Sequence, residues 1–136
     1  IRLSLVGSEM CIRDRVTTAL QAAEAAEDEG ISLEVIDLRS LSPVDYDTVA
    51  TSVRKTGRVV VAHEASREAG MAAEVIASVT ERCFEYLESA PLRVTGHDVP
   101  YPPAKLEKYH LPDLDRLLDA VDRVLDRPNS LTGADA

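Results

Sequence analysis

Residues 57–64 read GRVVVAHE, and residues 31–38 read ISLEVIDL. Both stretches are short apolar runs rich in β-branched residues, and ISLEVIDL carries apolar side chains on both faces of an extended chain. Strands of this kind are typical of a sheet that is covered on both faces. Each stretch therefore predicts a parallel strand in the interior of a sheet, and residues 91–96, PLRVTG, predict a third, shorter strand.

Segments with helical periodicity alternate with these strands. The spacing predicts helices over residues 16–30, 45–57, 70–87 and 113–126, whereas residues 97–112 are too rich in proline for regular structure. Such alternation indicates an α/β domain with a mostly parallel sheet in three αβα layers. Gly30 and Gly57 are the predicted ends of the first two helices, and Asp45 is the predicted cap at the start of the second. The predicted core faces of the four helices, in chain order, are Ala19, Leu20, Ala23 and Ala26; Val49 and Val53; Ala72, Ile76, Val79, Cys83 and Leu87; and Leu114, Leu117, Leu118, Val121 and Leu125.

Composition narrows the classes of function. A chain of 136 residues with a net charge of −9 fits one domain, and it offers no basic stripe for nucleic acid. No apolar run is long enough for a membrane span and no secretory signal is visible, so we expect a cytoplasmic protein. Two cysteines form neither a disulfide framework nor a metal-ligand pattern, and we expect Cys83 to be part of the core.

Polar residues follow two of the predicted strands, at the edge where α/β sheets place their sites. His63 and Glu64 end one strand and precede Arg67, and His97 and Asp98 end the next. They are candidates for contact with a partner, or alternatively for local hydrogen bonds to the backbone.

Other polar residues suggest local roles. We expect His110 at the surface and an ion pair between Asp37 and Arg39. Phosphate-binding glycine motifs, nucleophile elbows and metal-ligand spacings are absent, so the residues alone predict no catalytic group, no cofactor-binding group and no metal ligand.

A series of spaced motifs resembles one enzyme family. EVIDLRSLSPVD, KTGRVVV followed by HE, GxxAEV, RVTGHDVPYPPAKLE and LPD stand in order between residues 34 and 113. The series is similar to the transketolase-like C-terminal domain in the beta subunit of 2-oxo-acid dehydrogenases, the decarboxylating components for pyruvate and branched-chain substrates. The resemblance covers residues 16–125 and implies a fragment of an oxidoreductase.

The resemblance implies that this domain lacks the active site. In the family, thiamine diphosphate and Mg are held by the alpha subunit and the beta subunit's N-terminal domain, so the fragment would bind neither and would be inactive alone. The implied partners are an alpha subunit, a second beta subunit in a heterotetramer, and the dihydrolipoyl acyltransferase. Glu88 falls where the acyltransferase's basic binding domain would dock, and His63, Glu64, Arg67, His97 and Asp98 fall near subunit contacts.

The first fifteen residues have a different character. IRLSLVGSEMCIRD resembles one reading frame of a transposase sequencing adapter, so we expect residues 1–15 to be non-native and Cys11 to carry no function. The native domain is then expected over residues 16–126, with a flexible tail at 127–136. The missing first strand would be filled by the alternating apolar residues Ile1, Leu3 and Leu5, which suit a vacant edge.

Two alternatives remain open at this level. A free-standing acidic α/β module could dock a basic partner, and another transketolase-like enzyme, such as a transketolase or a deoxyxylulose phosphate synthase, could carry a similar domain. The DVPYPPAKLE stretch favours the 2-oxo-acid dehydrogenases, although it does not indicate which 2-oxo acid is the substrate.

Overall fold

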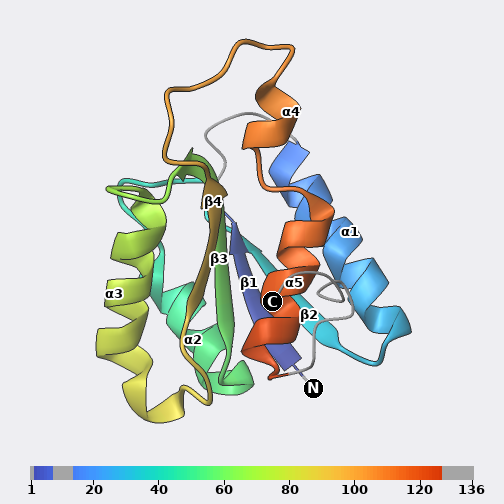
Figure 1. Ribbon diagram of the computed structural model, residues 1–136. Coiled ribbons are helices and arrows are strands. Elements are labelled where there is room, and N and C mark those ends of the chain that lie inside the picture. Colours follow the sequence, from blue (N-terminus) through green and yellow to red (C-terminus); the bar gives the residue numbers. More distant parts are fainter. Residues whose placement is uncertain (1, 8–13, 127–136) are drawn as a thin grey trace.

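A computed structural model describes residues 2–7 and 14–126 of the chain. Within these ranges, parallel strands alternate with helices, which confirms the predicted three-layer α/β fold (Figure 1). The elements are β1 (Arg2–Gly7), α1 (Asp14–Asp28), β2 (Ser32–Asp37), α2 (Tyr46–Thr56), β3 (Val59–Ser66), α3 (Met71–Cys83), the 3₁₀ helix η1 (Phe84–Tyr86), β4 (Leu92–Gly96), α4 (Glu107–His110) and α5 (Leu114–Val124).

The sheet has the strand order β2-β1-β3-β4, and every pair is parallel. Leu5 lies opposite Val35 on one side and Val60 on the other, so β1 joins β2 to β3. The prediction of an interior strand is confirmed for β3, whose first three valines are buried. It is wrong for β2, which is parallel but lies at an edge and is only half-buried.

Helices cover both faces of the sheet and enclose two separate cores. Helices α1 and α5 lie on one face and α2 and α3 on the other, as Figure 1 shows. The core under α1 and α5 is built on Leu3, Leu5, Val60, Leu117 and Val121. The opposite core contains Val6, Val49, Val53, Val59, Val61, Val75 and Val79, together with Cys83, which is the core residue that the sequence predicts.

Strand β1 contributes to both cores because its side chains alternate between the two faces. Leu3 and Leu5 pack beneath α1 and α5, while Val6 packs beneath α2, and all three are fully buried. The Ser4 hydroxyl also faces α2, where it hydrogen-bonds to Ser52 Oγ at 2.7 Å and to Thr56 Oγ1 at 2.7 Å. The segment therefore occupies an inner position in the sheet rather than the edge position that its sequence suggested.

Other expectations fall outside the described ranges. These concern residues 8–13 between β1 and α1, which include Cys11, and the tail at residues 127–136. The non-native origin of residues 1–15 stays a prediction.

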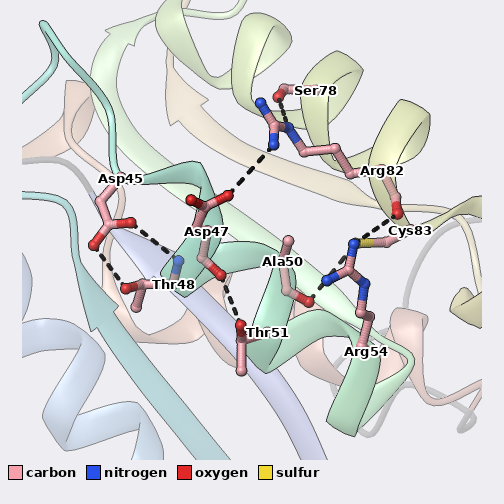
Figure 2. Close-up of polar contacts among 9 residues, drawn as sticks. All are labelled: Asp45, Asp47, Thr48, Ala50, Thr51, Arg54, Ser78, Arg82 and Cys83. Carbon is pink, nitrogen blue, oxygen red and sulfur yellow. Dashed lines mark hydrogen bonds and ion pairs between the residues drawn. The ribbon is translucent and has the colours of Figure 1, made fainter.

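Polar contacts fasten α2 to α3 at their solvent side (Figure 2). Asp45 caps α2, as predicted, by accepting from the Thr48 amide at 3.1 Å. The Arg82 side chain of α3 pairs with Asp47 at 3.5 Å, and the Arg82 backbone carbonyl accepts a hydrogen bond from Arg54 Nη2 at 3.3 Å. Beneath these contacts, the buried Cys83 thiol lies 3.7 Å from the Ala50 carbonyl. The inner sides of both helices pack in the apolar core there.

Several helix details differ from the predictions. In α1 the buried residues are Ala19, Ala22 and Ala26, whereas Leu20 is 54% exposed, so the predicted apolar face is rotated. The third helix is shorter than predicted because it ends at Cys83 and tightens into η1, and its predicted core residues Ile76 and Leu87 are only partly buried. The proline-rich stretch still forms one short helix, α4.

Local predictions at three turns hold. Arg39 Nε lies 3.3 Å from Asp37 Oδ2, which is the expected ion pair after β2. Gly30 and Gly57 end α1 and α2 with φ angles of +76° and +70°. At Gly57 the amide donates to the Val53 carbonyl at 2.8 Å, and the carbonyl accepts from the Glu88 amide at 2.8 Å.

We expect Gly57→Ala to destabilise the protein more than Gly30→Ala. A left-handed backbone conformation destabilises each alanine variant by about 1–2 kcal/mol relative to glycine. A Cβ at Gly57 would also meet Glu88 Cγ at 2.8 Å and the Tyr86 carbonyl at 3.1 Å, whereas Gly30 has no atom within 4 Å of that position. Urea unfolding of both variants measures the difference, and equal losses would contradict the close packing at Gly57.

Candidate functional site

The carboxyl ends of β3 and β4 lie side by side, and their following loops meet there. Ser66 of β3 is opposite Gly96 of β4. The Glu68 amide donates to Asp98 Oδ1 at 3.0 Å, which ties the loop after β3 to the loop after β4. The structure thus brings together five of the six predicted site residues at this end of the sheet, namely His63, Glu64, Arg67, His97 and Asp98.

An irregularity in β3 positions the first of these residues. The register is Ala62 to Val94 and then Ser66 to Gly96, so four steps along β3 correspond to two along β4. The extra residues bend the strand, and His63 lies within this segment. Its ring is buried, with 4% of the residue exposed, beneath the start of α3. There a Cβ on Gly70 would approach His63 Cε1 to 2.6 Å, so only glycine leaves room for the imidazole.

Burial keeps His63 neutral. Desolvation lowers the pKa of its imidazole below the usual 6.5, the positive charge of Arg93 lowers it further, and the backbone of Ala65 partly opposes the shift. Neither ring nitrogen makes a hydrogen bond of good geometry to a described residue. The imidazole is therefore held in a packed site in which its uncharged form is favoured.

A second imidazole is buried at the same end of the sheet, contrary to expectation. His110 at the end of α4 is 4% exposed, because the chain that leaves β4 returns at α4 and places this ring against Gly96. Its ring contacts His97 and Tyr101 edge-on, with centroids 6.1 and 5.1 Å apart. A Cβ on Gly96 would come within 2.6 Å of His110 Nε2, so this glycine also makes space for a histidine.

The sixth predicted residue lies elsewhere. Glu88 follows η1 at the opposite end of the sheet, beside the start of β3, where its carboxylate pairs with Arg58 Nη1. The Glu88 side chain is 58% exposed, so this carboxylate is both oriented and accessible. The structure therefore divides the predicted residues between two opposite ends of the domain.

Among residues 2–7 and 14–126, no group of three His, Cys, Asp or Glu side chains is placed to hold a metal ion. Within the same ranges, no helix is long and apolar enough to cross a membrane.

Sequence reasoning missed three residues of the carboxyl end, namely Gly70, Gly96 and His110. The first two stand in the GxxAEV and RVTG motifs, where an unexplained glycine could have signalled a close approach. No comparable signal marks His110, because its burial depends on how the loop after β4 returns.

Comparisons with known proteins agree with the fold. The family described as "Transketolase, C-terminal domain" matches residues 14–117. The chain belongs to this family. A split-gene transketolase, described as an inactive beta4 tetramer, superposes with a TM-score of 0.69 at 30% identity, over 94% of this chain and 39% of that one.

Relatives of this transketolase C-terminal domain include beta subunits of dehydrogenases. The chain is 57% identical over 110 residues to the pyruvate dehydrogenase E1 component subunit beta of Leifsonia xyli, covering 81% of this chain and 33% of that protein. It is 54% identical over 114 residues to the 3-methyl-2-oxobutanoate dehydrogenase subunit beta of Mycobacterium tuberculosis, covering 83% and 33%. The chain thus spans about a third of the length of these relatives.

Buried neutral His63 should make stability depend on pH. Its pKa is lower in the folded than in the unfolded state, so the unfolded state binds the proton more readily. The free energy of unfolding should therefore fall as pH drops below the ordinary value of 6.5, by at most about 1.4 kcal/mol per pH unit for one proton.

Urea unfolding between about pH 8 and 5, the range in which histidine titrates, tests this. His63→Gln should flatten the dependence, whereas the exposed control His97→Gln should keep it. A wild-type slope retained in His63→Gln would show that another group is responsible.

Proposed function

We propose that this domain is the C-terminal part of the beta subunit of a 2-oxo-acid dehydrogenase decarboxylating component. The complete enzyme would oxidatively decarboxylate a 2-oxo acid in the cytoplasm and transfer the acyl group to lipoamide. The observation that carries the proposal is the 54–57% identity to beta subunits named for this chemistry. Relatives named for pyruvate and for branched-chain substrates match at similar identity, so the proposal covers both.

Within that enzyme, the domain would serve assembly and docking rather than catalysis. Thiamine diphosphate and Mg would be held by the alpha subunit and the beta subunit's N-terminal domain, and the present chain would be inactive alone. The family match supports this division, because it is to a transketolase C-terminal domain and the chain spans about a third of its relatives' length.

The carboxyl end of the sheet would face the alpha subunit and the second beta subunit. In Figure 1 the loop after β4 projects beyond the strand ends. Four large apolar or aromatic side chains on this loop are more than half exposed, which is typical of a protein interface. They are Val99, Tyr101, Leu106 and Tyr109.

The opposite end would receive the basic binding domain of the dihydrolipoyl acyltransferase. Glu88 presents an exposed carboxylate there, and Arg58 holds its orientation. Phe84 and Tyr86 lie immediately before it and are 73% and 51% exposed. An acidic group beside exposed aromatic rings suits a basic partner whose charges steer the approach.

We also propose that residues 1–15 are not native to this protein. The family match begins at residue 14, close to the boundary that the adapter resemblance gives. In this account β1 takes the inner position that a native strand would fill.

Sequencing the genomic region upstream of codon 16 tests the enzyme proposal and the origin of residues 1–15 together. We expect an in-frame transketolase-like N-terminal domain and a native strand in place of residues 2–7. A native start codon close to residue 16 would instead support a free-standing acidic module and would contradict the enzyme assignment.

The docking proposal predicts that Glu88→Lys weakens binding of the acyltransferase's subunit-binding domain. Loss of an exposed charge pair between the two proteins weakens the binding free energy by about 0.2–1 kcal/mol, and reversing the charge of Glu88 should at least double that loss. Calorimetry with the complete beta subunit should show a larger effect at low salt than at high salt. Glu24→Lys, an exposed reversal on α1, is the matched control, and equal losses in both variants would exclude a specific role for Glu88.

A further inference from the structure

A groove beside the edge strand β4 gathers arginine side chains. It lies between β4 and α5, next to the loop that follows β3, and encloses about 160 Å³. Four guanidinium groups line it, whereas the lining residues that the structure describes include one carboxylate, Asp119. In a chain with a net charge of −9, this concentration of positive charge is unusual. The arginines are Arg67, Arg93, Arg116 and Arg123.

Backbone contacts hold two of these arginines in place. Arg93 on β4 donates from Nη1 to the Arg67 carbonyl at 3.1 Å. Arg116 in the first turn of α5 donates from Nη2 to the Thr95 carbonyl at 2.6 Å. Two guanidinium groups are thereby fixed before any ligand arrives, which lowers the entropy cost of binding.

Within the groove, acceptors and negative groups offset only part of the positive charge of the four arginines. Arg116 Nη1 is buried and has no hydrogen-bond partner among the described residues. Arg123 lies 3.7 Å from Asp119, but its side chain is 62% exposed, so this pair contributes little. One carboxylate cannot neutralise four guanidinium groups, and a buried donor without an acceptor is costly. Both features favour an anionic ligand.

We propose that this groove binds the phosphate group of a small molecule. Guanidinium forks match phosphate and carboxylate oxygens in bidentate geometry, and a phosphate supplies three acceptor oxygens and more charge than a single carboxylate. The groove has room for a phosphate or pyrophosphate group. The proposal goes beyond assembly and docking, and it does not depend on the enzyme assignment.

Calorimetric titration of the 136-residue chain with inorganic pyrophosphate, at constant ionic strength, tests the site. We expect one binding event, and the double variant Arg67→Gln/Arg123→Gln should weaken it by about tenfold or more through lost charge-assisted hydrogen bonds. Neither side chain donates to the backbone in the described contacts, so this variant should keep the fold. The control Arg39→Gln/Lys55→Gln removes the same charge on the far side of the sheet and should change affinity less than about twofold.

Four results would overturn the proposal. Absence of binding at millimolar pyrophosphate would exclude the site. Equal weakening in the control would mean that net charge alone attracts the anion. Tricarballylate binding as tightly as pyrophosphate would exclude the assignment to phosphate. If the double variant unfolds, the Nε resonances of Arg93 and Arg116 in the wild-type chain decide, since they should shift on titration; no shift would exclude the groove.

Discussion

The fold depends on the backbone pairing of β1, because this strand alone connects β2 to the rest of the described sheet. β3 must satisfy its amides and carbonyls on two edges, and β1 and β4 supply them. The side chains of β1 also enter both cores. Any segment with alternating apolar residues and a small polar group opposite Ser52 meets these demands. Residues 2–7 therefore fit this position in the sheet whether or not they are native to the protein.

Close packing of glycine against imidazole organises the carboxyl end of the sheet. The irregular register of β3 turns His63 inward, and the return of the loop after β4 brings His110 to a similar depth. Gly70 and Gly96 leave the space that each ring occupies. Because protein interiors are close-packed, these contacts transmit position from the strands to the exposed loop. The loop is thereby held in a defined shape at the carboxyl end of the sheet.

Charge is distributed unevenly over this acidic domain. Glu88 and its aromatic neighbours lie at one end, the polar strand ends lie at the other, and the arginine groove runs beside β4. Arg93 connects the last two, since it lines the groove and its charge lowers the pKa of His63. The domain thus presents three surfaces of different chemistry.

The sequence by itself determined the local elements and the family. Periodicity placed the strands and helices, turn chemistry placed Asp45, Gly30 and Gly57, and the spaced motifs identified the transketolase C-terminal domain. These features depend on residues close together in the chain, so they can be read from it directly.

Tertiary structure alone decided which strand is interior, which face of α1 is buried and which histidines are covered. β2 lies at the edge although its sequence is apolar on both faces, and His110 is buried although prolines bound its loop. The arginine groove likewise joins residues from β4, α5 and the loop after β3. Such features arise from contacts between distant segments, and their free energies are set by packing and desolvation that no local pattern records.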